Sequence, residues 1–279
     1  MKIAIATCQR LPEPDADEGV LLDALRAKGL EANLLAWDDG SAPFAGHDLV
    51  VLRSTWNYYE HADAFRAWID RTSNATTLLN PAHVVHANIE KTYLRDLEAR
   101  GIDVVPTAFA EHGDDLDRLL KERRWDDEKI VIKPVVSAGS FRTKSFTPNE
   151  RAEARAFFAE LTNERPAMVQ PWMASVETYG ERSLVWIAGD VTHAIRKTPR
   201  FAGNDEQVSG EMPVTPDERA FATRVLARFA SDILYARVDI VNDRGTLRVM
   251  ELELIEPSLF FLQCPRALEK FVDEIAARG

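Results

Sequence analysis

Short apolar runs alternate with helical patterns at the start of the chain. Residues 2–8 (KIAIATC), 31–37 (EANLLAW) and 47–55 (HDLVVLRST) have the length and apolar content of buried strands. Apolar positions at helical spacing predict helices over residues 18–28 and 62–71. Strands that alternate with helices in this way predict an α/β lobe with a parallel sheet covered by helices.

Four residues fall where the predicted parallel strands end. Cys8 ends the first strand, and Arg53, Ser54 and Thr55 end the third. Ligands of open parallel sheets bind beyond the carboxyl ends of the strands, so we expect a substrate pocket here with Arg53 as an anion anchor. A capped loop with Arg53 in a surface ion pair is an equally supported alternative. No Gly-x-Gly-x-x-Gly follows the first strand, which disfavours a dinucleotide-dependent oxidoreductase.

The middle of the chain combines two lysines with a loop of small residues. A helix is predicted over residues 86–101, with Lys91 near its start. Lys133 lies within the predicted strand 129–134, where an ammonium group is costly unless it faces a polar cleft. The sequence SAGS at 137–140 follows, and its small residues permit close approach of backbone N–H groups to an anion. Taken alone, Lys91 would be an ordinary solvated lysine and SAGS an ordinary hairpin turn.

Two helix starts carry strong capping signals. Residues 147–150 and 215–218 both read Thr-Pro followed by a polar residue and Glu, which is the pattern of a capping box with proline at the first helical position. We expect these helices to reach about Leu161 and Ala230, and a last helix over 266–278. These are structural features without catalytic meaning.

Two further strand patterns separate these helices. Residues 167–173 (AMVQPWM) predict a strand that enters a hinge, in which Trp172 could equally be a buried core residue. Residues 183–197 predict a hairpin that turns at Gly189-Asp190 and ends in Arg196 and Lys197. Those two basic residues either meet a phosphate or carboxylate of a ligand or are simply exposed.

The stretch from Tyr235 to Pro257 carries the strongest chemical signal. It predicts two strands joined by a polar turn. Alternation places Arg237 and Asp239 on one face of the first strand, and Glu251 and Glu253 on one face of the second. An odd-numbered loop with Gly245 in a left-handed conformation would bring all four onto the same face. Such carboxylates suit Mg²⁺, although an acidic solvent-facing strand is the simpler alternative.

These motifs in this order resemble the ATP-grasp enzymes, which have Arg-x-Asp, then Glu-x-Asn, then Pro near the C-terminus. Within that superfamily, SAGS, QPWM, GERSL and ELELIEPSL are most similar to the O-ureido-D-serine cyclo-ligase group, next to glutathione-synthetase-like and ribosomal-modification-like ligases. Two departures stand out. Glu253 replaces the usual Asn, and the loop at 201–210 lacks the expected arginine and paired glycines.

The resemblance implies a division of the chain and a role for each motif. It implies a pre-ATP-grasp lobe at 1–85, a central lobe at 86–172 and a C-terminal lobe at 173–279. It implies catalytic roles for Arg237 and Lys133. The implied ATP-binding residues are Lys91, Lys133, Ser137, Gly139, Ser140, Gln170, Trp172, Met173, Glu177 and Arg196. The implied Mg²⁺ ligands are Asp239, Glu251 and Glu253.

The implied activity is an ATP- and Mg²⁺-dependent ligase. A carboxylate would be phosphorylated to an acyl phosphate, and an amine of a second substrate or of the same molecule would then displace phosphate. Arg237 would stabilise the oxyanion that forms in that second step. A phosphotransferase on the same scaffold and a nucleotide-binding module without turnover are the alternatives. The four charged groups of the last two strands argue against the module.

Composition adds limits to this interpretation. The chain has 279 residues, 46% hydrophobic content, a net charge of −11 and two cysteines. The negative charge without a basic run argues against nucleic acid or anionic membrane as partners. Two cysteines give no disulfide framework, a strand pattern directly follows the first two residues, and no run reaches membrane-spanning length, so we expect a cytoplasmic protein. The expected partners are small carboxylate and amine substrates, and a homodimer is compatible with the sequence.

Overall fold

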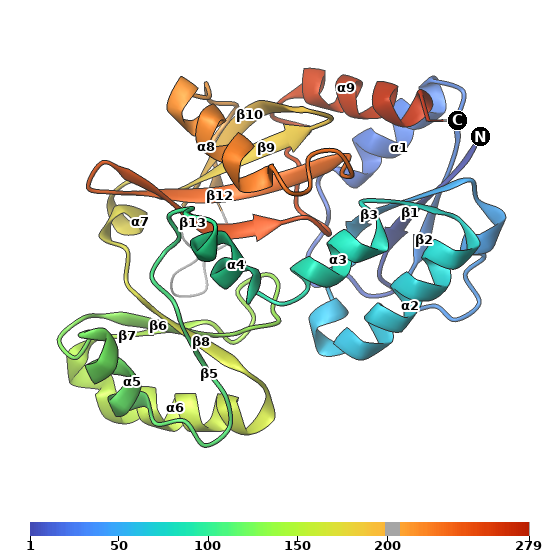
Figure 1. The fold of residues 1–279 in the computed structure, drawn as a ribbon. Coiled ribbons are helices and arrows are strands. Elements are labelled where there is room, and N and C mark those ends of the chain that lie inside the picture. The colour runs from blue at the N-terminus through green and yellow to red at the C-terminus, as the bar shows by residue number, and fades with distance from the viewer. Residues whose placement is uncertain (199–206, 279) are drawn as a thin grey trace.

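The computed structural model describes residues 1–198 and 207–278, and the backbone of these residues forms three sheets. Figure 1 shows the sheets in three lobes, with the smallest lobe standing apart from the other two. No described helix is both long enough and apolar enough to cross a membrane.

The N-terminal lobe contains the predicted parallel sheet. Its strand order is β2-β1-β3-β4, and all neighbours are parallel. The strands are β1 (Lys2–Thr7), β2 (Glu31–Ala36), β3 (Leu49–Ser54) and β4 (Thr77–Leu79). The helical elements are α1 (Glu18–Ala27), η1 (Phe44–Gly46), η2 (Tyr58–Glu60), α2 (Ala62–Ala75) and α3 (Ala82–Asn88). The α/β expectation for this part of the chain is confirmed.

The central lobe is a small antiparallel sheet with two helices on one face. Its strand order is β5-β8-β6-β7. The strands are β5 (Ala108–Ala110), β6 (Ile130–Pro134), β7 (Lys144–Phe146) and β8 (Ala167–Pro171). The helices are α5 (Leu116–Arg123), η3 (Pro148–Glu150) and α6 (Arg151–Glu164). Its apolar cluster is made of residues between 108 and 169 alone, so this lobe has a core of its own.

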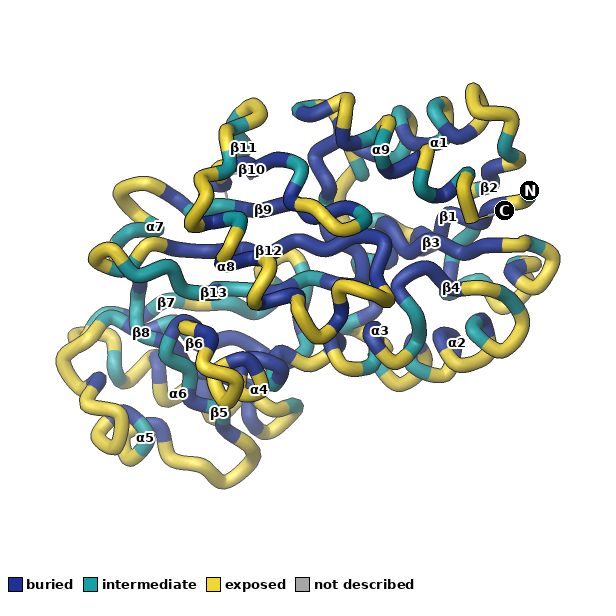
Figure 2. The backbone as a smooth tube through the Cα atoms, turned by 45° about the horizontal axis from the view of Figure 1, so that its top comes forward, coloured by how far each residue is buried: buried dark blue, intermediate teal, exposed yellow. Residues whose placement is uncertain are grey.

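The C-terminal lobe is an antiparallel sheet of order β11-β10-β9-β12-β13. Its strands are β9 (Glu181–Ile187), β10 (Asp190–Thr198), β11 (Gln207–Val208), β12 (Tyr235–Asp243) and β13 (Thr246–Glu253). The helices around it are α4 (Tyr93–Ala99), α7 (Ala174–Thr178), α8 (Pro216–Leu226) and α9 (Pro265–Ala276). Figure 2 shows β9 and β12 buried along most of their length.

Asn80 fastens the N-terminal lobe to the C-terminal lobe. Its side-chain amide donates to the carbonyl oxygens of Tyr235 at 2.8 Å and Leu254 at 2.7 Å, and its oxygen accepts from the N–H of Leu234 at 2.8 Å. Asn80 itself is fully buried. These bonds join the ends of β12 and β13 to the end of β4, so the two lobes share one continuous core. The three-lobe division at residues 85 and 172 stays a prediction.

Helix boundaries differ from the predictions in several places, and α2 runs to Ala75 where an end at residue 71 was expected. The helix expected over 86–101 is two helices, α3 and α4, interrupted at Lys91. The backbone N–H of Lys91 donates to the carbonyl of Val135 at 3.0 Å instead of continuing a helix. The helix after Thr215 ends at Leu226 rather than near residue 230. Both predicted capping boxes are confirmed, at Thr147 and Thr215.

Candidate active site

The three lobes enclose a cavity of about 560 Å³. This is the size of a small-molecule site. The predicted residues that line it are Lys91, Lys133, Ser137, Gly139, Ser140, Gln170, Trp172, Met173, Arg237, Glu251 and Glu253. The structure therefore brings together most of the residues that the ATP-grasp resemblance implies, from segments as far apart as Lys91 and Glu253.

The pairing of β12 with β13 places the four charged residues as expected, by a different route. Arg237 lies opposite Glu253, and Asp239 lies opposite Glu251. The loop is a two-residue turn, not an odd-numbered one, with left-handed conformations at Arg244 and Gly245. A two-residue turn alone would put the glutamates on the opposite face from Arg237 and Asp239. A β-bulge adds one residue to β13, where the register shifts between Asp239 and Ile240, and this returns the glutamates to the same face.

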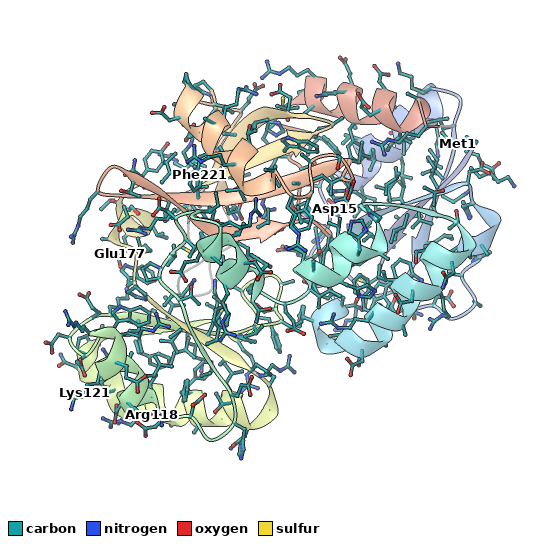
Figure 3. The ribbon with its side chains drawn as sticks, viewed as in Figure 1. Met1, Asp15, Arg118, Lys121, Glu177 and Phe221 are labelled. Atoms are coloured by element: carbon teal, nitrogen blue, oxygen red, sulfur yellow. The ribbon has the colours of Figure 1, made fainter. Side chains whose placement is uncertain are left out.

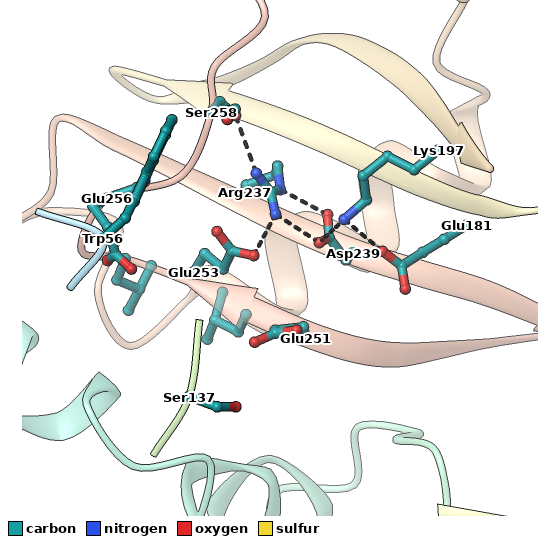
Figure 4. Close-up of polar contacts among 12 residues, drawn as sticks. Trp56, Ser137, Glu181, Lys197, Arg237, Asp239, Glu251, Glu253, Glu256 and Ser258 are labelled. Carbon is teal, nitrogen blue, oxygen red and sulfur yellow. Dashed lines mark hydrogen bonds and ion pairs between the residues drawn. The ribbon is translucent and has the colours of Figure 1, made fainter. Parts of the chain in front are cut away.

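Asp239 is held by two cations in the floor of the cavity. Nε of Arg237 donates to Oδ1 of Asp239 at 2.9 Å, and Nζ of Lys197 donates to Oδ2 at 2.6 Å. Asp239 is fully buried, which alone would raise its pKa, but Arg237 and Lys197 together hold that pKa below its usual value. Lys197 also pairs with Glu181 at 2.6 Å, as Figure 4 shows.

Two lysines lie on the side of the cavity that faces β13. Nζ of Lys91 pairs with Glu251 and donates to the carbonyl of Ser137 at 2.9 Å. Lys133 is 9% exposed, and within residues 1–198 and 207–278 no group forms a hydrogen bond or ion pair with its Nζ. Burial lowers the pKa of Lys133, although Glu251 opposes the shift. A buried, unpaired ammonium at a cavity wall is suited to an anionic ligand.

Two carboxyl groups on the cavity wall, those of Glu253 and Glu256, have raised pKa values, whereas Lys91 and Lys133 lower the pKa of Glu251 against its burial. Burial raises the pKa of Glu253 to about 7 even though Arg237 opposes the shift, and burial followed by the charge of Glu253 raises the pKa of Glu256 to about 8. A cation bound nearby would offset the cost of burying these two groups in their charged form. The carboxylate donors present here therefore fit Mg²⁺ in chemical type.

The carboxylates are not grouped as a complete metal site. No three His, Cys, Asp or Glu side chains of the described residues lie close enough to hold a metal ion by themselves. Mg²⁺ commonly takes one or two carboxylates and completes its shell with waters and substrate phosphates, so this arrangement still suits it. Glu251 and Glu253 line the cavity, whereas Asp239 lies beneath it with both oxygens bonded to Arg237.

The expected substrate anchor lies elsewhere. Cys8, Arg53, Ser54 and Thr55 are buried and do not line this cavity, which contradicts their expected placement. Arg53 is 1% exposed and its Nη2 lies 3.6 Å from the carboxylate of Asp17, so the pair is internal and not the surface pair of the alternative interpretation.

Arg53 and Asp17 instead fix the segment after β13. The guanidinium carbon of Arg53 lies 5.8 and 5.9 Å from the ring centres of Tyr235 and Phe261. The carboxylate of Asp17 accepts from the N–H groups of Leu259 at 2.8 Å and Phe261 at 2.7 Å. This segment begins beside the cavity, so the buried pair positions one of its walls.

Two residues expected to bind the nucleotide also lie outside the cavity lining. Glu177, labelled in Figure 3, lies exposed on α7 and pairs with Lys129 at 3.0 Å. Arg196 is exposed, with its guanidinium carbon 5.5 Å from the centre of the Tyr179 ring. Alternation along β10 turns Lys197, not Arg196, toward the cavity.

Several cavity residues were not among the implied site residues, although Lys197 was one of two basic residues expected either to meet a ligand or to be exposed. They are Trp56, Tyr58, Tyr93, Glu181, Lys197, Glu256 and Ser258. One signal for two of them was available, because the β9–β10 hairpin puts Glu181 directly opposite Lys197 as a cross-strand pair of opposite charge. Of the divergent loop at 201–210, residues 201–206 lie outside the described residues.

Comparison with known proteins decides the fold. Residues 3–80 match the family model of the N-terminal domain of D-cycloserine synthetase DcsG. The chain is 28% identical to the cycloserine biosynthesis protein DcsG of Streptomyces lavendulae, over 95% of this chain and 94% of that protein. The crystal structure of D-cycloserine synthetase DcsG superposes with a TM-score of 0.91 at 28% identity, covering 100% of this chain and 99% of the other. The chain has the ATP-grasp fold.

More distant ATP-grasp ligases share this fold. The ligase PsnB, in complex with its minimal precursor, Mg and ADP, has a TM-score of 0.65 at 16% identity, covering 99% of this chain and 97% of the other. D-alanine–D-alanine ligase from Bacillus anthracis, in complex with ATP, has a TM-score of 0.68 at 15% identity, covering 99% and 96%. The similarity to DcsG over nearly the whole chain identifies this protein as an ATP-dependent ligase.

Proposed function

We propose that this ATP-grasp ligase joins a carboxylate to a nitrogen nucleophile through an acyl phosphate, on a small amino-acid-like substrate. The observation that supports this most directly is the unpaired ammonium of Lys133 in the same cavity as Arg237, Glu251 and Glu253. The cavity thus offers positive charge for phosphates on one wall and carboxylates for a cation on the other.

ATP would lie with its base at the apolar end of the cavity. Val131, Trp172, Met173, Met250 and Leu252 line that end, between β6, β8 and β13. The backbone N–H of Trp172 donates to the carbonyl of Lys129 at 2.7 Å, so it is not free to bond to the base. We therefore assign the Trp172 side chain a packing role toward the base. Glu177 and Arg196 have no part in this proposal.

The phosphates would lie between the lysines and the SAGS loop. Lys91 and Lys133 carry the positive charge, and the backbone at Gly139 and Ser140 has the left-handed conformations that turn N–H groups toward a ligand. Glu251 and Glu253 are the residues that would hold Mg²⁺, which would supply further charge neutralisation when bound. Asp239 would act through Arg237 and Lys197, which it positions.

The chemistry then proceeds in two balanced steps. A substrate carboxylate oxygen attacks the γ-phosphorus of ATP, and ADP leaves, which gives an acyl phosphate. The nitrogen attacks the carbonyl carbon, the C–O bond to phosphate breaks as the C–N bond forms, and the nitrogen loses one proton to phosphate or water. Arg237 lies at the cavity wall where it can donate to the oxyanion of this second step. When both groups belong to one molecule, the product is a ring, as the name D-cycloserine synthetase indicates for the similar protein.

Water must be kept from the acyl phosphate, and the loop between β6 and β7 is placed for this. The ring of Phe141 lies 4.5 Å from the ring of Tyr59, which joins the central lobe to the N-terminal lobe over the cavity. Arg142 pairs with Glu160 and Glu164 of α6, which supports the loop from behind. Exclusion of water prevents hydrolysis of the reactive intermediate.

Hydroxylamine tests this proposal. A panel of small carboxylic acids is incubated with ATP, Mg²⁺ and hydroxylamine, and ADP, phosphate and hydroxamate are measured. We expect at least one acid to give ADP, phosphate and hydroxamate in equal amounts. A stable phosphorylated product without phosphate release or hydroxamate would instead establish a phosphotransferase.

A further inference from the structure

Glu256 differs from the carboxylates of the C-terminal sheet that lie in or beneath the cavity wall. It follows β13, it is 8% exposed, and it lines the cavity. Glu181, Asp239, Glu251 and Glu253 each pair with a lysine or arginine. Within the described ranges 1–198 and 207–278, no hydrogen bond or ion pair reaches the carboxylate of Glu256.

The position of Glu256 is fixed by the backbone and not by its side chain. Nε1 of Trp56 donates to the backbone carbonyl of Glu256 at 3.0 Å, which ties the N-terminal lobe to this residue. Figure 4 shows the Glu256 side chain beside Trp56, on the wall that also carries Arg237. The fold thus holds the carboxyl group of Glu256 at the cavity without giving it a hydrogen-bond or ion-pair partner among the described residues.

A buried carboxylate without a partner is costly, so this arrangement needs an explanation. The pKa of Glu256 is raised to about 8, by burial first and then by Glu253. A bound cation would offset this cost by favouring the charged form. The missing partner is therefore expected to be a positively charged group that enters with a ligand.

The surroundings favour an organic cation over a metal ion. Trp56 and Tyr58 also line the cavity, and Tyr58 is buried. Trp56 bonds to the backbone of Glu256, and burial and then the charge of Glu256 raise the pKa of Tyr58, so both lie near this residue. Aromatic faces attract ammonium groups, whereas Mg²⁺ requires oxygen ligands. The indole N–H of Trp56 is a donor only and already bonds to the Glu256 carbonyl, so it offers a metal nothing.

We propose that Glu256, with Trp56 and Tyr58, forms the subsite for the protonated amino group of the substrate. This proposal rests on the proposed ligase function. Nη1 of Arg237 donates to the carbonyl of Ser258 at 3.3 Å, two residues after Glu256, so the group assigned to the reacting carboxyl and the group assigned to the amine are neighbours on one wall. The substrate class that fits both is an α-amino acid, whose carboxylate and ammonium are separated by a single carbon.

Matched pairs of acids test this subsite. Each of a set of α-amino acids, in both enantiomers, is compared with the 2-hydroxy acid of the same side chain, for example serine with glycerate and alanine with lactate. The rate of hydroxamate formation, measured with Mg²⁺-ATP and hydroxylamine over a range of acid concentrations, gives kcat/KM for each acid. We expect the amino member of the accepted pair to be favoured by roughly tenfold or more, the scale for losing a charge-assisted hydrogen bond.

Glu256→Gln should remove this preference. We expect this variant to have a raised KM for the amino acid and a KM for ATP within about twofold of that of the parent protein. This is the pattern for a group that contacts only the substrate amine. Glu256→Asp, which keeps the charge, should retain part of the preference. Glu60→Gln is the matched control, since Glu60 is exposed and does not line the cavity.

Calorimetry on the same pairs, with a non-hydrolysable ATP analogue and Mg²⁺, separates this proposal from the proposed function. Preferential binding of an amino acid that disappears in Glu256→Gln supports the subsite, even when no acid gives hydroxamate and the ligase proposal fails. Hydroxamate formation without any preference for amino over hydroxy acids keeps the ligase and overturns the subsite. A preference that survives unchanged in Glu256→Gln overturns it as well.

Discussion

Lys133→Met should change nucleotide binding and protein stability in opposite directions. The ammonium of Lys133 is buried at the cavity wall, and its pKa is lowered because burial outweighs the attraction of Glu251. The free protein therefore bears a cost for this charge, which the phosphates of ATP would offset. Methionine has a similar length and no charge, so it removes both the cost and the phosphate contact.

The two magnitudes follow from the unpaired state of Lys133. Loss of one hydrogen bond to a charged group costs about 1.5–3 kcal/mol, so the affinity for Mg²⁺-ATP should fall about 10- to 150-fold. The free energy of unfolding without ligand should stay level or rise, by about 1–3 kcal/mol at most, because apolar replacement of buried charge is often stabilising. A lysine that served only the fold would show a loss of stability instead.

Calorimetric titration with a non-hydrolysable ATP analogue and urea denaturation of the free protein measure the two quantities. Lys144→Met is the matched control on neighbouring β7, since Lys144 is exposed and its Nζ lies 4.7 Å from the Phe157 ring, outside the cavity lining. Undiminished nucleotide affinity in Lys133→Met, or an equal loss in both variants, would refute the assignment of Lys133 to the phosphates.

Three further predictions concern the acidic wall and Arg237. Glu251→Gln should abolish Mg²⁺-dependent ATP turnover, and full turnover in this variant would exclude Glu251 as a metal ligand. The same change should lower the free energy of unfolding by about 1–3 kcal/mol, because the buried ammonium of Lys91 loses its charged partner. Arg237→Met should slow hydroxamate formation by roughly 10²-fold or more, the scale for one oxyanion donor, and an unchanged rate would remove Arg237 from the second step. Burial raises the pKa of Glu253 to about 7 and that of Glu256 to about 8 from an ordinary value of 4.5, so both bind protons more tightly in the folded than in the unfolded state. The stability of the free protein should therefore fall as the pH rises from about 4.5 to 8, and thermal unfolding of Glu256→Gln should show a flatter pH dependence over this range.

The local pattern of apolar residues determined the elements of the fold. Buried strands such as KIAIAT and AMVQP, and the capped helices after Thr147 and Thr215, depend on residues close in sequence, and they lie near their predicted positions. The Arg237–Asp239 and Glu251–Glu253 pairs were predicted on one face because strand alternation is a local property. The order of these motifs was enough to indicate the ATP-grasp fold.

The tertiary structure decided the details on which the site depends. A β-bulge beside Asp239, not the turn, sets the register, and bulges depend on the neighbouring strand. The helix breaks at Lys91 because its N–H bonds to Val135, 44 residues further along the chain. Arg53 became an internal partner of Asp17 because packing of two lobes buried the strand end that would otherwise open to a ligand.

Glu256 shows the limit of the sequence most clearly. In the sequence it is one more acidic residue after Glu251 and Glu253, with nothing to separate it from them. Trp56, 200 positions earlier in the chain, bonds to its backbone carbonyl at the cavity. Only the full set of neighbours shows that no lysine or arginine of the described chain pairs with its carboxylate, although Lys91 and Arg237 act against the rise of its pKa. Secondary structure follows from interactions between near neighbours, whereas the charge balance of a cavity is a sum over all the segments that surround it.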